Sequence, residues 1–176
     1  MLSIHQRPFA PADRTQPGHW EGDLIVGKNQ RSAIGTLVER QTRLIRLMHL
    51  PTRDADSLRL AIATTMGGLP PALTRSITWD QGIEMARHTD ITADLGVKVY
   101  FCDSRSPWQR GSNENANGLL RQYFPKGTSL NIHTPDHLRA VEYEINNRPR
   151  HILGDRSPTE LFTALLASPD HQLLRR

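Results

Sequence analysis

Cysteine is nearly absent from this chain, and long apolar runs are absent altogether. Cys102 is the single cysteine among 176 residues, which excludes a disulfide framework and a zinc site built from cysteines. No apolar run approaches the ~20 residues that a membrane-spanning helix needs, and the first residues lack the apolar stretch of a signal peptide. Hydrophobic residues make up 37%, below the usual share, so we expect a small core. These absences predict one soluble, intracellular domain.

Lysine is also scarce, although the chain carries a net charge of +4 from 22 basic and 18 acidic residues. All of the basic residues except Lys28, Lys98 and Lys126 are arginines. Because the planar guanidinium grips phosphate through paired hydrogen bonds, this balance favours a nucleic-acid partner. The base composition of a genome can also favour Arg over Lys, so charge alone leaves both explanations open.

The chain divides into three parts by its pattern. Residues 1–18 carry three prolines and no hydrophobic period, which predicts an extended linker or arm. Residues 19–168 alternate between strand-like and helix-like patterns and form the predicted core. Residues 169–176 are expected to be a C-terminal tail.

The core begins with three short β-prone runs, at residues 24–26, 33–38 and 44–50, which predict adjacent antiparallel strands. Two further strands are expected at 76–79 and 97–101. Helical spacing or capping signals predict helices at 55–66, with Thr52 as its cap, and at 83–95, 112–123, 134–147 and 157–167. The fold class is therefore α/β, with a mixed five-stranded sheet flanked by helices.

Three carboxylates occupy places that suit chemistry. Asp23 lies inside a strand-like segment, where Asp is disfavoured, and Asp80 stands at the end of a strand, where ligands of α/β sheets tend to collect. Glu114 lies on a helix with polar Asn117 and Arg121 on its face. Three carboxylates from separate elements can hold two Mg²⁺ or Mn²⁺ ions.

Three longer motifs surround these acids: GHWEGDLI at 18–25, WDQGIEM at 79–85 and SPWQRGSNEN at 106–115. Together they resemble the catalytic core of a DDE transposase of the insertion-sequence-thirty family, within the retroviral-integrase superfamily. The segments at 123–127, 146–150 and 157–160 resemble that family too, so the likeness covers nearly the whole chain.

The resemblance implies a ribonuclease-H-like fold and a transposase catalytic domain that cleaves and transfers DNA strands in transposition and DNA integration. It implies that Asp23, Asp80 and Glu114 are the catalytic residues and the ligands of Mg²⁺ or Mn²⁺, with two ions. It also implies transposon ends and target DNA as partners, a homo-oligomer, no membrane, and a place in the bacterial cytoplasm with the nucleoid.

Four residues are expected to contact DNA. By resemblance, Arg110 lies in a loop that approaches the DNA end, although Trp108 could equally pack this loop down. Asn117, Arg121 and Lys126 complete the set. Glu84 could be a fourth acid near the metal, but we favour a carboxylate at the start of a helix, because Glu114 matches the third position of the family better.

Alternatives to an active transposase core stay open. Members of the family place a helix-turn-helix region before the core, whereas here only residues 1–18 precede it, which predicts a truncated member, a fragment or half of a split product. The chain could then be a non-catalytic remnant that modulates a full-length transposase. Another ribonuclease-H-like nuclease is possible in principle, but the segment WQRGSNE at 108–114 argues against it.

Overall fold

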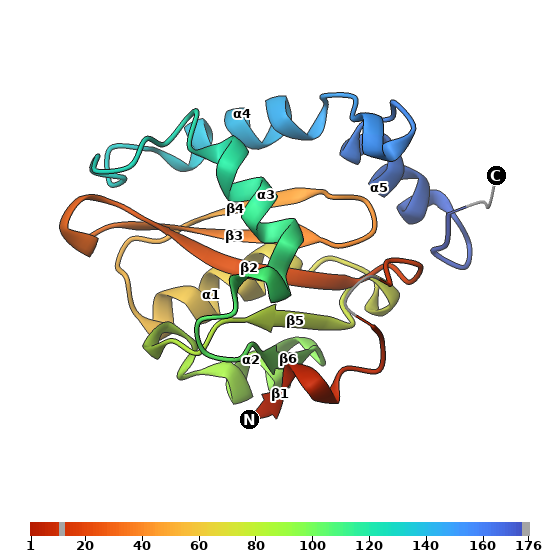
Figure 1. The fold of residues 1–176 in the computed structure, drawn as a ribbon, viewed down its shortest axis with the longest axis horizontal. Coiled ribbons are helices and arrows are strands. Elements are labelled where there is room, and N and C mark those ends of the chain that lie inside the picture. Colours follow the sequence, from red (N-terminus) through yellow and green to blue (C-terminus); the bar gives the residue numbers. More distant parts are fainter. Residues whose placement is uncertain (11–12, 174–176) are drawn as a thin grey trace.

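A mixed sheet of six strands runs through the molecule in the order β1-β6-β5-β2-β3-β4 (Figure 1). The computed structural model describes residues 1–10 and 13–173, and for Ile83 the backbone alone. In chain order the strands are β1 (Leu2–Ser3), β2 (His19–Val26), β3 (Ala33–Glu39), β4 (Ile45–His49), β5 (Ser76–Trp79) and β6 (Lys98–Phe101).

The first three long strands form the antiparallel ladder that the sequence predicts. β2 pairs with β3 and β3 with β4, whereas β5 and β6 join the other side of β2 in parallel. The sheet has one strand more than the five predicted, because Leu2 and Ser3 pair in parallel with Tyr100 and Phe101. Two residues are too few to show an alternating pattern, so nothing in the sequence marks this strand.

Helices cover both faces of the sheet. One core joins the sheet to α1 and α2, and a second core joins the opposite face to α3 and α4. Helix α3 crosses the front of the sheet in Figure 1, and α1 lies behind it. The helices are α1 (Ala55–Met66), α2 (His88–Leu95), α3 (Gly111–Leu120), α4 (Pro135–Asn146) and α5 (Pro158–Ala167).

Two helix starts differ from the prediction. The cap of α1 is Asp54 rather than Thr52, because the Asp54 carboxylate accepts a hydrogen bond of 2.7 Å from the backbone of Ser57. The helix predicted over 83–95 is interrupted: a 3-10 turn spans Ile83–Met85, and α2 begins only at His88.

Strand alternation separates the side chains of β2 between the two faces. Trp20 and Leu24 point into the core beside α1, whereas Ile25 lies in the core beside α3 and α4. Asp23 shares the Ile25 side by the same alternation. The residue before Asp23 is Gly22, where a Cβ would collide with the ring of Trp79.

The outer edge of β4 is closed by two side chains of α4. The Asn146 amide donates to the Ile45 carbonyl at 2.8 Å and accepts from the Ile45 N–H at 2.9 Å. The Glu142 carboxylate accepts from the Leu47 N–H at 2.9 Å and pairs with Arg46 at 2.8 Å. The outward N–H and carbonyl of Ile45 and the outward N–H of Leu47 are thereby occupied.

The segment predicted as an arm, residues 1–18, lies against the sheet where the structure describes it. Arg7 donates to the Thr78 hydroxyl at 3.2 Å, and Arg40 donates to the Asp13 carbonyl at 2.9 Å. The predicted tail also makes contact, since Leu173 packs against the first core, and residues 174–176 lie outside the described residues. Among the helices of the described residues, none is long and apolar enough to cross a membrane.

Candidate active site

Asp23 and Asp80 come from neighbouring parallel strands. The register of β2 and β5 pairs Glu21 with Thr78. Asp23 and Asp80 each lie two residues further on and are therefore level with each other on one face. Neighbouring strands lie ~4.8 Å apart, so the topology brings these two predicted acids side by side.

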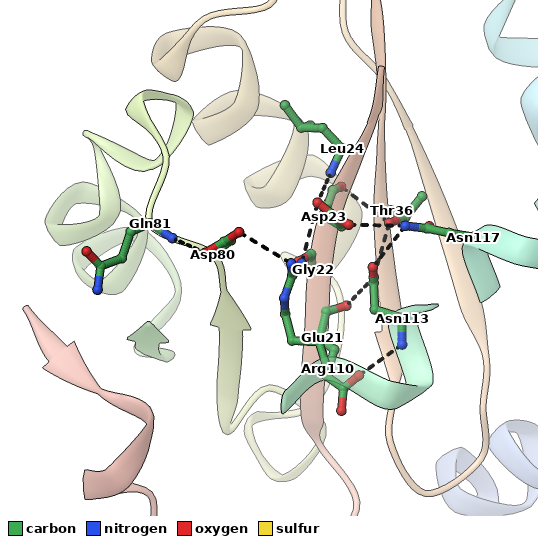
Figure 2. A network of polar contacts seen from close by, with 10 residues as sticks. All are labelled: Glu21, Gly22, Asp23, Leu24, Thr36, Asp80, Gln81, Arg110, Asn113 and Asn117. Carbon is green, nitrogen blue, oxygen red and sulfur yellow. Dashed lines mark hydrogen bonds and ion pairs between the residues drawn. The ribbon is translucent and has the colours of Figure 1, made fainter. Parts of the chain in front are cut away.

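The guanidinium of Arg110 lies between the two carboxylates (Figure 2). Its Nη1 is 3.4 Å from Oδ1 of Asp23, and its Nη2 is 3.7 Å from Oδ2 of Asp80. Nη1 also donates to the Gly22 carbonyl at 2.8 Å. Arg110 is only 7% exposed, and its Nε is buried with no hydrogen-bond partner among the described residues.

The charges of the two carboxylates hold Arg110 in its cationic form. Burial acts to lower the pKa of Arg110, but the charge of Asp23, followed by smaller contributions from Cys102 and then Asp80, outweighs it, so that the pKa is raised above its ordinary value. A single cation supplied by the chain thus lies between the two carboxylates and offsets one of their two negative charges.

Buried polar contacts anchor α3 on this face of the sheet. The backbone N–H of Asn113 donates to Oε2 of Glu21 at 2.9 Å, and its side chain donates to the Thr36 hydroxyl at 3.2 Å. One turn later, Asn117 donates to Oδ2 of Asp23 at 3.1 Å. Glu21 in turn pairs with buried Arg40 at 3.2 Å. Figure 2 shows this network running from β2 into α3.

Glu21 is the residue that sequence reasoning missed. The β-prone run covers residues 24–26, and Asp23 lies in the strand-like segment before it, whereas β2 begins at His19. A strand extended to His19 would have placed Glu21 on the same face as Asp23, because their spacing is two. Its partner Asn113 could not be identified from the sequence, because the contact joins residues 92 positions apart.

Glu114 stands apart from the two aspartates. It is exposed in the first turn of α3, three residues before Asn117. Across residues 1–10 and 13–173, no group of three His, Cys, Asp or Glu side chains is close enough to hold a metal ion. The chemistry of the donors still fits a divalent cation, because Asp23 and Asp80 offer hard oxygens at a place that already attracts positive charge.

The four predicted DNA contacts lie in different surroundings. Arg110 is buried between the aspartates rather than on the surface, and Asn117 contacts Asp23. Arg121 donates to the backbone carbonyls of Phe124 and Val26, at 3.2 and 3.4 Å. Lys126 is exposed.

The loop before α3 is not packed down by its tryptophan. Trp108 is 70% exposed, so the interpretation in which this side chain holds the loop against the core is wrong.

Glu84 and His19 behave as structural groups. The carboxylate of Glu84 fills the space that a Cβ on Gly82 would take, in the 3-10 turn Ile83–Met85. His19 is hydrogen-bonded to Ser76 and Gln16, both at 2.7 Å, so its ring acts as a structural hydrogen-bonding group. Burial and, to a lesser degree, the charge of Arg40 lower the pKa of His19 to about 4.

Comparison with known proteins agrees with the sequence motifs. The profile of the family described as "Integrase core domain" matches residues 13–107, more than half of the chain. The chain is 47% identical over 173 residues to the transposase of insertion sequence element IS1086 from Cupriavidus metallidurans, covering 98% of this chain and 51% of that protein. It is 46% identical over 167 residues to transposase InsI of element IS30C from Escherichia coli, covering 95% of this chain and 43% of that protein. The chain therefore spans about half the length of these curated relatives.

Solved structures share the fold at low identity. The catalytic core domain of BIV integrase matches with a TM-score of 0.60 at 18% identity, over 83% of this chain and 93% of that one. A chain of the simian T-cell lymphotropic virus intasome, solved in complex with PP2A regulatory subunit B56 gamma, matches with a TM-score of 0.67 at 18% identity, over 92% of this chain and 59% of that one. The fold is ribonuclease-H-like, as predicted, and the chain belongs to the integrase core domain family, with insertion-sequence transposases among its relatives.

Proposed function

We propose that this domain cleaves DNA strands and transfers them to a target with the help of divalent metal ions, as insertion-sequence transposition requires. The observation that carries the proposal is the convergence of Asp23 and Asp80 on one guanidinium, on the face of the sheet that α3 covers. Transposases and integrases of this family act on DNA and in general use divalent metal ions, which supports this assignment.

Asp23, Asp80 and Glu114 are the residues that would hold the metal, Mg²⁺ or Mn²⁺, with two ions in the working site. Such ions, when bound, activate an attacking oxygen and stabilise the leaving oxygen of a phosphodiester. The Glu114 side chain is exposed in the first turn of α3, so it can turn toward the aspartates without displacing a buried group.

The chain's own residues prepare this site. Asn117 fixes the orientation of the Asp23 carboxylate, and Asn113 ties α3 to the sheet through Glu21. Arg110 keeps the aspartates close together by placing one positive charge between their two negative charges. Its side chain must move aside before the Asp80 and Asp23 oxygens can take other cations.

Two reactions follow in order. A water oxygen attacks the phosphorus at the end of the element, the bond between phosphorus and the 3′ oxygen breaks, and the 3′ oxygen leaves as a hydroxyl. This 3′-hydroxyl then attacks a phosphorus of target DNA and displaces another 3′ oxygen. No covalent bond to the protein forms in either step.

The finer contacts with DNA are part of the same proposal. Lys126, on an exposed loop, contacts the phosphate backbone, and Arg121 holds the start of that loop through the Phe124 carbonyl. Arg110 and Asn117 face the bound strand from within the site. The working form is a homo-oligomer on transposon ends and target DNA, in the bacterial cytoplasm with the nucleoid.

The experiment supplies the protein with Mn²⁺ and a short or pre-nicked duplex and follows strand cleavage and transfer. We expect slow turnover and products that end in a 3′-hydroxyl. Glu114→Gln should abolish turnover, because the amide keeps the shape of the side chain but loses its charge. Glu84→Gln is the matched control and should keep it, because Glu84 packs against Gly82.

Metal binding gives an independent measurement. Saturating Mn²⁺ should raise the melting temperature of the wild-type protein, because a ligand of the native state adds stability. Asp80→Asn should remove this response. Activity lost in Glu84→Gln but kept in Glu114→Gln would refute the assignment of the third acid. If the protein shows no turnover and inhibits a full-length relative, the assignment as an enzyme would be replaced by that of a regulatory remnant.

A further inference from the structure

Two arginines from distant parts of the chain meet at the first turn of α3, and a third lies near one of them. Arg14 comes from the segment before β2, Arg43 from the turn between β3 and β4, and Arg150 from the segment after α4. Arg14 donates to the hydroxyl of Ser112, and Nη1 of Arg43 lies 3.5 Å from the same oxygen. Arg150 is close enough for the charge of Arg43 to act on it. We call these three residues the arginine row.

The arginine row has no carboxylate partner within 4.0 Å among the described residues. The two acids whose charges act on Arg14 and Arg43 are already engaged by other groups. Glu21 bonds to Arg40 and to the backbone of Asn113. Glu39 is buried, accepts hydrogen bonds from Thr42 and Gly18, and has its pKa raised by that burial.

Positive charge is therefore concentrated here without an ion pair. Burial lowers the pKa of each member of the row, and the charge of Arg43 lowers those of Arg14 and Arg150 further. All three side chains are partly exposed. Nη2 of Arg150 is itself buried and has no hydrogen-bond partner among the described residues. Arg59 on α1 differs, since it pairs with Asp94 at 2.8 Å.

The backbone at Arg43 adds a second, independent observation. Its φ is +65°, in the left-handed region, and its N–H closes the turn by donating to the Glu39 carbonyl at 2.9 Å. Glycine is the residue that this conformation favours. The position nevertheless carries a long cationic side chain directed at Ser112.

We propose that the arginine row binds the phosphodiester backbone of a nucleic-acid strand next to the active site. The inference rests on the proposed function and extends it by a second contact region, at the start of α3. Ser112 and Asn117 are separated by about 7.5 Å along the helix axis, close to the rise of two nucleotides in one strand. A strand with a phosphate near Asp23 can therefore lay the phosphate two nucleotides away on the row.

The test measures the affinity for a fluorescent duplex by anisotropy, in EDTA, over a range of salt concentrations. Arg43→Gly is the main variant, because the left-handed backbone makes glycine acceptable and the fold should be retained. We expect a several-fold loss of affinity and a decrease of about one in the slope of log K against log salt. Arg14→Gln should act in the same direction.

Arg59→Gln is the matched control, because it removes one charge from a helix on the opposite face. Its affinity and salt slope should stay close to those of the wild type. Arg43→Gly with unchanged affinity and slope would overturn the proposal. Competition by millimolar inorganic phosphate that is as complete as competition by DNA would also overturn the proposal, because it would indicate a site for a single anion. Preferential binding of poly-glutamate would overturn it as well.

Binding in EDTA is independent of turnover, so this inference and the proposed function can fail separately. If the variants of the arginine row bind DNA weakly and the wild type cleaves no DNA, the proposed enzymatic function is refuted, whereas the role of the arginine row in DNA binding is supported. In an active protein, Arg43→Gly should raise the KM for DNA and keep kcat at saturating DNA. A loss of kcat with unchanged KM would overturn the proposal.

Discussion

Replacing Arg110 by methionine removes the cation that joins the two aspartates while keeping most of its apolar stem. The variant loses a hydrogen bond of 2.8 Å to the Gly22 carbonyl and two ion pairs, at 3.4 and 3.7 Å. It leaves Asp23 and Asp80 side by side, with their repulsion uncompensated.

The size of the effect follows from the burial of each group. A hydrogen bond from a charged donor contributes about 1.5–3 kcal/mol. The ion pairs add little, because the Asp23 and Asp80 side chains are 31% and 48% exposed and solvent screens them. The unpartnered Nε already costs the wild type some stability, and its removal offsets part of the loss. We therefore expect Arg110→Met to lower the free energy of unfolding by about 1–2 kcal/mol in metal-free buffer.

Urea unfolding with EDTA and with Mn²⁺ measures both halves of this argument. Mn²⁺ should stabilise Arg110→Met more than the wild type, because no guanidinium competes for the carboxylates. Arg139→Met, at a position where the side chain is 75% exposed, is the control and should unfold like the wild type. Unchanged stability combined with an unchanged response to Mn²⁺ would refute the idea that Arg110 occupies the cation site.

Two further predictions concern the sheet. Because the folded-state pKa of His19, about 4, lies below the ordinary 6.5, the unfolded chain takes up the proton first as the pH falls. The contribution of His19 to the free energy of unfolding should be full above pH 6.5 and fall by up to about 3 kcal/mol toward pH 4. Urea unfolding midpoints measured against pH should fall less steeply in His19→Asn than in the wild type. Equal slopes for the two proteins would contradict the prediction. Gly22→Ala should lower the free energy of unfolding by about 1–3 kcal/mol through its collision with Trp79. Gly118→Ala, which meets no atom within 4 Å, should raise it instead, and similar melting curves for the two variants would be incompatible with the packing described.

Local pattern was sufficient for the elements that carry the site. The three antiparallel strands were predictable because their apolar runs are separated by short polar connections, and α1 because its buried residues follow the helical period. The motifs also identified the family. The catalytic roles of Asp23, Asp80 and Glu114 remain predictions.

The contacts that hold the site together could not be predicted from the local sequence pattern. The bond from Arg110 to the Gly22 carbonyl joins residues 88 positions apart, and that from Arg14 to Ser112 joins residues 98 positions apart. Such contacts depend on how the sheet and α3 pack, and no periodicity encodes them. Strand β1 was missed for a different reason, because a pair of residues carries no period.

The closed edge of β4 has a consequence for how copies of the protein can meet. An exposed strand edge is a template on which another chain can add a strand, and this is a common route to aggregation. Here the outward N–H groups of Ile45 and Leu47 already donate to Asn146 and Glu142. At the other end of the sheet, β1 is only two residues long. Continuous β-sheets between molecules are therefore disfavoured, so self-association must use side-chain surfaces, and Asn146→Leu should make concentrated solutions more prone to form fibrils.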